Sequence, residues 1–367
     1  MKLIKFLKRI ARTIIALKVL VSDRKNFDDY SYFPEYSSKR KTKFRIFCEQ
    51  LCHVVKYSYC NNFYFLLGFD IKDFRNQIEY VDNNTFMRQR DIQNHKNNNS
   101  LISVLRDKSI FDIVANKYKI CTPKILSLVD EHRNVYDYES ESQISFVEYL
   151  KKSDFDVFLK VIDGECADGV FHIICNKEYV MYQDNKYSIE DFIDMLPKGS
   201  KLILQEKMTE QHPAINLIYS KAINTIRLIT VISPITKKPT VFSAVLRVGV
   251  GNSEVDNWAT GGLAIGIDTE SGQLRKYGYY KPGYGTKTDE HPDTHVSFEG
   301  YTVPYMKEAL DEACRFHSIL SSVHSIGWDI AITENGPCFI EGNENWEIPA
   351  LQTCNYGLQS EFEKLFY

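Results

Sequence analysis

The sequence predicts an α+β protein with a helical N-terminal extension. Two apolar segments flank Asn335-Gly336, and this dipeptide is the strongest short signal for a β-hairpin. From about residue 101 onward, other apolar strands, such as residues 155–160, alternate with segments of helical spacing. Residues 1–22 and 39–67 carry helical spacing, so we expect the start of the chain to be helical.

The composition limits the class of protein. A chain of 367 residues has room for one large multi-lobed domain or for two domains. Its net charge of −3 gives no general attraction to nucleic acid, and 44% hydrophobic with 25% charged residues is typical of a soluble globular protein. The nine cysteines show neither a CxxC pair nor Cys/His ligand spacing. We therefore expect reduced thiols in a cytoplasmic protein.

The hairpin near the C-terminus carries the clearest candidate site. Folding the chain about Asn335-Gly336 places Asp329 across from Glu341 to Asn343, so that three oxygen ligands converge. Magnesium prefers such hard oxygen donors, with water and phosphate completing its shell. The spacing alone leaves two interpretations open: a magnesium–nucleotide site, or ordinary solvated carboxylates at strand ends.

The segment Gly327-Trp-Asp-Ile-Ala, followed by Gly336-Pro and Ile340-Glu-Gly-Asn343, resembles the metal-binding end of the ATP-grasp superfamily. The sequence of this motif is similar to that of the sugar-transfer-associated ATP-grasp proteins, whose genes are found among those for bacterial surface polysaccharides. The resemblance implies an ATP-grasp fold, in which two α+β lobes clasp nucleotide between antiparallel sheets. The chain then divides into a helical N-terminal extension (1–100), a small lobe (101–200) and a large lobe with the metal site (201–367).

Residues 1–22 form a basic amphipathic pattern. The pattern is too interrupted for a transmembrane helix, and Lys18 breaks the apolar run that a signal peptide would need. Two interpretations remain: the segment lies on the anionic inner membrane face as a peripheral contact, or it packs on the protein's own core. One face of the predicted helix carries the apolar residues Leu3, Leu7, Ile10, Ile14, Leu17 and Val21, and the cations are Lys2, Lys5, Lys8, Arg9, Arg12 and Lys18.

Two lysines in the small lobe are candidate phosphate ligands. Lys108 opens a helix that runs to Lys117, and Lys160 ends a strand beside a glycine-containing hairpin at 161–170. A lysine at a strand end can place its ammonium on a phosphate while backbone N–H groups cover the remainder. The order of residues is not that of a Walker A loop. The resemblance implies nucleotide contacts for both lysines, whereas ordinary surface lysines are the alternative.

The next strand, residues 201–208, is apolar and runs into polar residues. The resemblance implies that it joins the lobes and that its end, with Gln205, Glu206 and Met208, binds the adenine and ribose of the nucleotide. The alternative is an edge strand with a solvated acid.

Two arginines lie within strands that are otherwise apolar. A charge in such a strand usually has a partner, so an internal salt bridge is one interpretation of Arg227. The resemblance implies instead that Asn224 and Arg227 line the phosphate and substrate wall. It makes Arg247 the second catalytic candidate, which stabilises the charge that develops as a carboxylate attacks the γ-phosphate.

Polar and glycine-containing loops supply further candidate substrate ligands. Glycines let a loop lie flat against a ligand, which favours Asn257, Gly261 and Gly262. His291 lies in a loop whose sequence is similar to that of the family, which makes it a candidate substrate ligand, although most loop histidines are merely exposed.

The resemblance implies an ATP-dependent carboxylate–amine ligase that uses ATP and one or two Mg²⁺ ions. Its substrates would be a small-molecule or glycan carboxylate and an amine, and its product an amide on a sugar acid of a capsule or O-antigen. Two other classes stay open: an ATP-grasp-type kinase that phosphorylates a sugar or small molecule, and a non-catalytic partner of glycosyltransferases.

Overall fold

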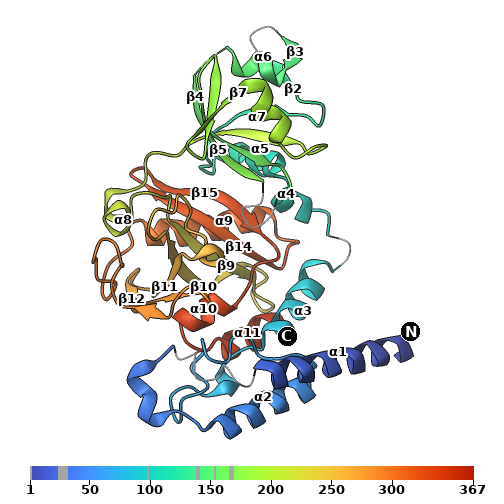
Figure 1. Cartoon of the computed structure of the whole chain (residues 1–367), viewed down its shortest axis with the longest axis vertical. Helices are drawn as coiled ribbons and strands as arrows, with labels where there is room; N and C mark the ends of the chain where they lie inside the picture. Colours follow the sequence, from blue (N-terminus) through green and yellow to red (C-terminus); the bar gives the residue numbers. More distant parts are fainter. Residues whose placement is uncertain (1, 24–31, 97–98, 138–140, 153, 165–168) are drawn as a thin grey trace.

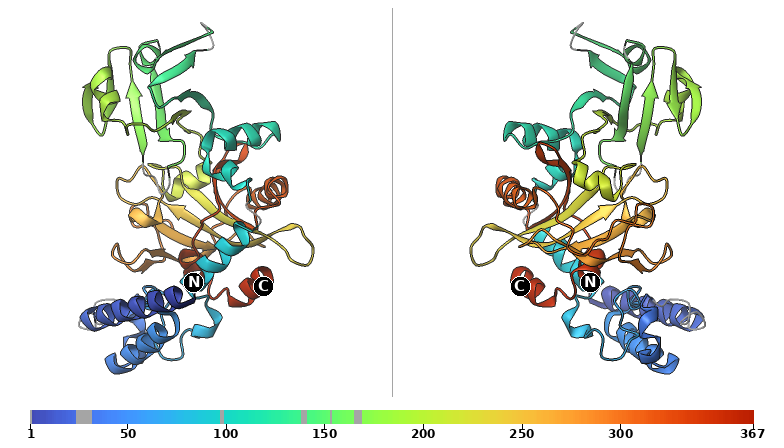
Figure 2. Two further views of the ribbon diagram at one scale, coloured as in Figure 1. Left: turned by 90° about the vertical axis from the view of Figure 1, so that its right-hand side faces the viewer. Right: turned by 90° about the vertical axis from the view of Figure 1, so that its left-hand side faces the viewer.

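The computed structural model describes residues 2–23, 32–96, 99–137, 141–152, 154–164 and 169–367. Within these residues the chain forms two antiparallel sheets, of eight and seven strands. The two sheets follow one another along the long axis of the molecule, and the N-terminal helices lie at the end beyond the seven-stranded sheet (Figures 1 and 2).

The eight-stranded sheet has the strand order β3-β2-β1-β8-β4-β5-β6-β7. Alternate residues of its central strands point into one core, as Val157 and Leu159 of β4 do, because successive side chains of a strand face opposite sides. Helices α6 (Phe146–Leu150) and α7 (Ile189–Met195) cover this core. The strands are β1 (Ile125–Val129), β2 (Asn134–Asp137), β3 (Ser142–Ser145), β4 (Phe155–Val161), β5 (Val170–Cys175), β6 (Tyr179–Tyr182), β7 (Asn185–Ser188) and β8 (Leu202–Glu206).

The strand β8 pairs with β1 and β4 in the middle of this sheet. The interpretation of residues 201–208 as an edge strand is therefore wrong. The sequence-based division placed this strand in the second lobe, and its pairing joins it to the first. The domain boundaries themselves stay a prediction.

The seven-stranded sheet has the order β13-β12-β11-β10-β9-β14-β15. Its central strands are buried on both faces, which explains why they read as continuous apolar runs. Leu228 packs beneath helix α9 (Met306–Ile319), whereas its neighbour Ile229 packs on the opposite face with α10 (Pro349–Cys354) and α11 (Gln359–Phe366). The strands are β9 (Thr225–Ile232), β10 (Pro239–Val248), β11 (Leu263–Ile267), β12 (Leu274–Tyr280), β13 (Lys287–Thr288), β14 (Ser325–Thr333) and β15 (Gly336–Asn343).

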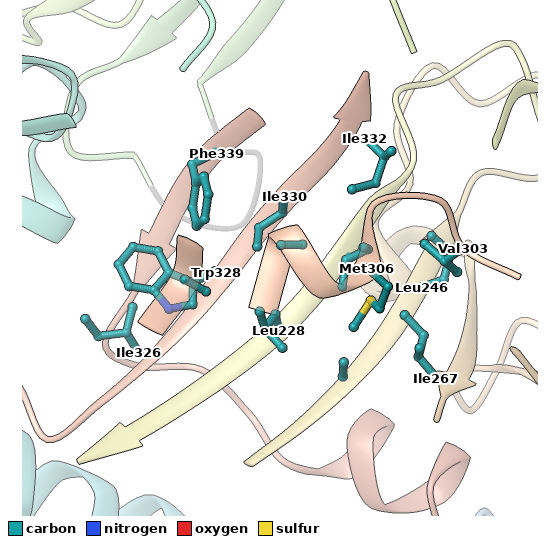
Figure 3. Close-up of a cluster of buried hydrophobic side chains, with 14 of the residues drawn as sticks. Leu228, Leu246, Ile267, Val303, Met306, Ile326, Trp328, Ile330, Ile332 and Phe339 are labelled. Atoms are coloured by element: carbon teal, nitrogen blue, oxygen red, sulfur yellow. The ribbon is translucent and has the colours of Figure 1, made fainter. Parts of the chain in front are cut away.

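The core beneath α9 fixes the hairpin that carries the candidate metal ligands. Trp328 stacks on Phe316 of α9 at a ring-centroid distance of 4.9 Å. Phe339 of β15 meets Trp328 edge-on at 5.6 Å, and Figure 3 shows these two rings side by side. Such aromatic packing locks the two strands against the helix. The polar residues of the hairpin are thus presented on a rigid support.

The N-terminal region contains α1 (Lys2–Asp23), α2 (Lys43–Tyr57) and α3 (Asn83–Asn94), with short 3-10 helices at Pro34–Lys39 and Gln77–Glu79. Phe86 of α3 is fully buried and meets Trp346 at 4.6 Å, so this region shares the second core of the seven-stranded sheet. The remaining helices are α4 (Ile102–Arg106), α5 (Lys108–Lys117), α8 (Pro213–Ile218) and the 3-10 helix η4 (Trp258–Thr260).

None of the helices described in the structure combines the length and the apolar character needed to cross a membrane.

Candidate active site

The hairpin of β14 and β15 confirms the expected position of Asp329, but its turn lies one residue earlier than predicted. Thr333 pairs with Gly336 across Glu334 and Asn335, and a bulge between Asp329 and Ile330 shifts the register beyond it. Asp329 is the register partner of Glu341, and Gly327 is the partner of Asn343. The turn works because Gly336 adopts a φ of +114°, which a residue with a side chain rarely tolerates. The Glu341 carboxyl lies close enough to Asp329 to help lower the pKa of Asp329. Asn343 Nδ2 donates to Glu341 Oε1 at 3.0 Å, so the three side chains do converge.

Arg227 and Arg247 converge on the same carboxylate. Arg227 on β9 donates from Nε to Asp329 Oδ1 at 2.5 Å and from Nη2 to Oδ2 at 3.0 Å. Arg247 on β10 places Nη2 3.1 Å from Asp329 Oδ2 and Nε 3.4 Å from Asp256 Oδ2. The predicted salt bridge of Arg227 is confirmed, and its partner is a candidate metal ligand.

The electrostatics of Asp329 follow from this arrangement. Asp329 is only 3% exposed, so the interpretation as a solvated strand-end carboxylate is wrong for this residue. Burial by itself would raise the pKa of Asp329, but Arg227 and Arg247 outweigh burial and lower the pKa to about 2. Burial would also lower the pKa of Arg247, and here Asp256, Asp329 and Glu341 outweigh it and raise the pKa. Both groups are therefore charged near neutral pH.

Lys160 reaches this cluster from the other sheet. Its Nζ donates to Gln205 Oε1 at 2.7 Å, and Gln205 Nε2 donates to the carbonyl of Pro123 at 3.1 Å. Burial lowers the pKa of Lys160 to about 8, with Glu341 opposing the shift and Lys108 adding to it. Lys160 is thus close enough to the hairpin carboxylate and to the second lysine to sense both charges.

Lys108 is held at the start of α5, which Asp107 caps by accepting from Ser109 N at 2.9 Å. The half-buried Lys108 ammonium donates to the carbonyl of Gly164 at 2.7 Å, so it is not a freely solvated surface lysine. The candidate phosphate hairpin at 161–170 begins where Lys108 binds, but its residues 165–168 lie outside the described part of the chain.

The segment after β8 presents the candidate adenine-binding residues. Glu206 ends the strand, its side chain is exposed, and its backbone N–H donates to Lys124 O at 2.9 Å. Met208 follows in an irregular segment and is half-buried. Gln205, in contrast, points its amide at Lys160 as described above.

Asn224 and His291 are packed in the interior beside this site. Asn224 is 1% exposed, its Nδ2 donates to the carbonyl of Tyr219 at 2.6 Å, and its Oδ1 accepts from Gly249 N at 3.1 Å. His291 has no exposed surface, and its Nε2 lies 2.8 Å from Gly249 O. The interpretation of His291 as an exposed loop histidine is therefore wrong. Burial lowers its pKa, so it is neutral near pH 7.

Asn257, Gly261 and Gly262 form a tight turn that follows Asp256. Asn257 Oδ1 accepts from Ala259 N at 2.9 Å and caps η4, and Gly261 ends it with a φ of +105°. A Cβ on Gly262 would lie 2.8 Å from Asp256 O and 2.9 Å from Val248 O, so the close approach requires glycine. The turn thereby positions Asp256 beside Arg247.

Sequence reasoning did not assign Asp256 or Thr225 to the site. Asp256 is 8% exposed, and its Oδ2 accepts from Thr225 N at 2.9 Å. Thr225 Oγ1 also accepts from Arg247 Nη2 at 2.7 Å. Burial raises the pKa of Asp256, and Arg247 opposes that rise. The available signal was Arg247 itself, because an arginine in an apolar strand requires a nearby acid.

The donor set at the hairpin fits a hard cation. Asp329 and Glu341 are register partners on neighbouring strands. Two carboxylates this close repel each other when both are ionised, and a cation between them would relieve that repulsion. The amide oxygen of Asn343 is a third donor of the kind that magnesium accepts. Across the described ranges, no group of three or more His, Cys, Asp or Glu side chains could hold a metal ion, and the hairpin reaches three donors only through the amide of Asn343.

Several solved structures are remotely similar to this chain. They include the VanG D-Ala:D-Ser ligase from Enterococcus faecalis, with 11% identity and a TM-score of 0.42 over 72% of this chain and 62% of that one. The L-amino acid ligase from Bacillus licheniformis has 10% identity and a TM-score of 0.38 over 73% and 49% of the two chains. The N5-carboxyaminoimidazole ribonucleotide synthetase from Thermotoga maritima has 13% identity and a TM-score of 0.33 over 66% and 43%.

This chain thus spans between 43% and 62% of the length of these three proteins. No curated protein matches its sequence significantly. The model of the family described as "Sugar-transfer associated ATP-grasp", however, matches residues 87–365, from α3 to the last helix. The chain therefore belongs to the sugar-transfer-associated ATP-grasp family, and its two-sheet architecture is that of an ATP-grasp protein.

Proposed function

We propose that this protein is an ATP-dependent carboxylate–amine ligase that works through an acyl phosphate. The observation that carries the proposal is the convergence of groups from both sheets. Lys160 of the eight-stranded sheet and Glu341 of the seven-stranded sheet act on each other electrostatically, and Asp329, Arg227 and Arg247 adjoin Glu341. Cations suited to phosphates thus face oxygen donors suited to magnesium.

The residues of this chain have distinct roles in the proposed reaction. The ammonium groups of Lys108 and Lys160 bind the phosphates of ATP, and the segment at Gln205, Glu206 and Met208 receives the adenine and ribose. Asp329, Glu341 and Asn343 hold one or two Mg²⁺ ions. When bound, magnesium neutralises the triphosphate and the charge that develops on the transferred phosphoryl group.

Arg227 and Arg247 orient the carboxylate substrate and the γ-phosphoryl group. Their guanidinium groups are fixed in advance by Asp329, Asp256 and Thr225, so little reorganisation is needed when charge develops. Both side chains keep some exposure, 20% for Arg227 and 14% for Arg247, through which a substrate oxygen can reach them.

The reaction balances without an enzyme nucleophile. A carboxylate oxygen attacks the γ-phosphorus, the bond from that phosphorus to the β–γ bridging oxygen breaks, and ADP leaves. The amine nitrogen then attacks the acyl carbon, the bond between that carbon and the phosphate oxygen breaks, and inorganic phosphate leaves. The nitrogen releases its proton to solvent, and an amide remains.

The description of the family as associated with sugar transfer supports a proposal for the substrate class. We infer that the carboxylate belongs to a sugar acid, such as a uronic acid, and that the amine is an amino acid or a simple amine. The amide would then be a constituent of a capsule or O-antigen polysaccharide.

Nucleotide turnover with pooled substrates tests the proposal. The protein is mixed with Mg-ATP, a set of amino acids and a set of nucleotide-linked uronic acids, and ADP, AMP and free phosphate are measured. We expect ADP and phosphate in equal amounts, dependent on both pools and lost in Glu341→Gln. The matched control is Glu308→Gln on the exposed face of α9, which should keep full turnover.

Other products would contradict the proposal in distinct ways. Release of AMP would overturn the acyl-phosphate mechanism. Formation of ADP without free phosphate would indicate a kinase. Failure to bind Mg-ATP would indicate a non-catalytic partner of glycosyltransferases.

A further inference from the structure

The first helix exposes a row of large apolar side chains. Along α1, Leu7 is 54% exposed, Ile14 61% and Val21 62%. They recur at intervals of seven residues, which keeps them on one face of a helix. Phe6, at 59% exposed, and Ile10, at 41%, lie beside them. We call Phe6, Leu7, Ile10, Ile14 and Val21 the apolar stripe of α1.

The apolar stripe is not the part of α1 that packs on the protein. The buried residues are Ala16 and Leu20, which join a small core with α2, and the partly buried Leu17 packs against the same core. Cys60 Sγ lies 3.3 Å from Ala16 O and Thr13 Oγ1 donates to Ser58 Oγ at 2.9 Å, so these contacts fix the orientation of the helix. Ala16 and Leu20 lie roughly a third of a turn from the centre of the stripe, at 100° per residue. The protein's own core therefore leaves the stripe uncovered.

The charged side chains of this helix are all cationic up to its last residue, Asp23. Residues 1–22 contain six lysines and arginines and no acid, whereas the whole chain has a net charge of −3. Lys8, Arg12 and Lys18 are exposed. An apolar stripe with cations and no acids complements a surface that is both apolar and anionic, which is the surface of a membrane that contains acidic phospholipids.

We propose that α1 lies in the plane of an anionic phospholipid membrane, with its apolar stripe inserted at the boundary between headgroups and acyl chains. This proposal does not depend on the proposed ligase activity. The helix lies at one end of the molecule, and the eight-stranded sheet is at the other end (Figures 1 and 2). A membrane that covers α1 would thus leave the candidate active site, near the middle of the molecule, open to dissolved substrates.

Vesicle sedimentation of the full chain tests the proposal. Vesicles of equal parts phosphatidylglycerol and phosphatidylcholine should pellet the protein, and vesicles of phosphatidylcholine alone should pellet much less. Ile14→Asp should weaken binding by at least about tenfold, because an isoleucine loses its apolar burial. Ile235→Asp is the matched control: Ile235 is 86% exposed in the β9–β10 turn, and its replacement should change nothing.

A separate variant tests the contribution of the cations of α1 to membrane binding. Lys8→Glu/Arg12→Glu/Lys18→Glu should weaken binding by about a hundredfold, since each cation near an anionic surface contributes about fivefold. Lys237→Glu/Lys238→Glu reverses exposed charges on the β9–β10 turn and should have no effect. Circular dichroism of each variant verifies that the fold is retained, because none of these positions is buried.

Three results would overturn the proposal. The first is equal binding to anionic and neutral vesicles, and the second is binding that Ile14→Asp leaves unchanged. The third is a dimer in sedimentation velocity that Ile14→Asp dissociates, together with no pelleting on anionic vesicles. In that case the stripe is an interface between two copies of the chain.

Discussion

Arg227 and Asp329 are register partners on the neighbouring strands β9 and β14, and two hydrogen bonds join their side chains. Arg247 on β10 contacts the same carboxylate. The candidate metal hairpin and the candidate phosphoryl-binding arginines are thus one electrostatic unit, in which a change at Asp329 alters the environment of both arginines. Mutations in this unit should therefore differ in whether they lower stability as well as activity.

Replacement of Asp329 should affect both stability and activity. Asp329→Asn leaves the largely buried Arg227 without its carboxylate and Arg247 with Asp256 alone, so we expect the free energy of unfolding to fall by about 3 kcal/mol and turnover to disappear. Glu341→Gln should also abolish turnover, but Glu341 is half-buried and its replacement should cost less than about 1 kcal/mol. Urea unfolding and nucleotide turnover measure the two effects. Equal stability losses in the Asp329 and Glu341 variants would contradict the conclusion that Asp329 is the carboxylate that pairs with both arginines.

The same unit predicts an acid-sensitive contribution to stability. The pKa of Asp329 is about 2 in the folded protein, below the usual value of about 3.9 for an unfolded chain. The stabilisation is therefore fully present above about pH 4 and is lost as the pH falls towards 2. Unfolding midpoints should decline more steeply over this range in the wild type than in Asp329→Asn. Parallel declines in the two proteins would count against this assignment.

Lys160 should take up a proton when ATP binds. In the free protein, burial holds its pKa at about 8, and a triphosphate beside the ammonium would raise that value. Above pH 8 the free protein is then mostly neutral at Lys160, and nucleotide binding must protonate it. Calorimetry at pH 8.5 in two buffers of different ionisation enthalpy measures this uptake.

The uptake should vanish in Lys160→Met and persist in Lys177→Met, which replaces an exposed lysine in the loop between β5 and β6. Proton uptake that survives Lys160→Met would assign the proton to another group. In the absence of nucleotide, Lys160 also affects the pH dependence of the free energy of unfolding. Because its pKa is depressed, charged Lys160 destabilises the folded protein at neutral pH, and this destabilisation is lost as the pH rises from about 8 to 10.5.

The parts of this protein that could be predicted from sequence are local. The hairpin follows from Asn335-Gly336 between two apolar strands, which brings Asp329 opposite residues 341–343. The bulge between Asp329 and Ile330, which sets the pairing with Glu341, has no such signal in the sequence. The helix from Lys108 to Lys117 follows from its cap and its spacing. The convergence of Asp329, Glu341 and Asn343 is a consequence of that local geometry.

The parts that could not be predicted depend on contacts between distant segments. Nothing near His291 in the sequence indicates that its ring bonds to Gly249 O, forty-two residues away. The pairing of β8 between β1 and β4 likewise requires the whole sheet. Hydrophobic periodicity identified an apolar face on α1, but it could not indicate that Leu17 of that face would pack beside Ala16 and Leu20 while Ile14 and Val21 stay exposed.

Gly262 should be intolerant of any side chain. The Cβ of Gly262→Ala would meet three backbone oxygens at 2.8–3.1 Å, and backbone cannot move aside as a flexible side chain can. We expect a loss of about 1–3 kcal/mol from overpacking, together with a weaker interaction of Asp256 with Arg247. Gly300→Ala is the control: it adds a Cβ in open space at a φ of +76° and should cost only about 1 kcal/mol of backbone strain. Thermal unfolding compares the two, and equal losses would show that the close contact has relaxed.

The attachment of the N-terminal region to the seven-stranded sheet gives the last prediction. Asn94, at the end of α3, is 1% exposed; its Nδ2 donates to Ser325 O at 3.1 Å and to Glu344 O at 2.8 Å, and its Oδ1 accepts from Ser325 N at 2.9 Å. Asn94→Ala leaves all three backbone groups buried without this partner, so we expect a loss of about 2–4 kcal/mol.

Because Ser325 begins the strand that carries Asp329, this loss should appear in the single cooperative transition of the body that binds nucleotide. Arg88→Ala, on the exposed side of the same helix, should leave that transition unchanged. If residues 1–100 were an independent extension, Asn94→Ala would instead shift a separate, earlier transition and leave the main one in place. Urea unfolding followed by both tryptophan fluorescence and far-ultraviolet circular dichroism distinguishes the two outcomes, since Trp328 and Trp346 report on the sheet and its two cores.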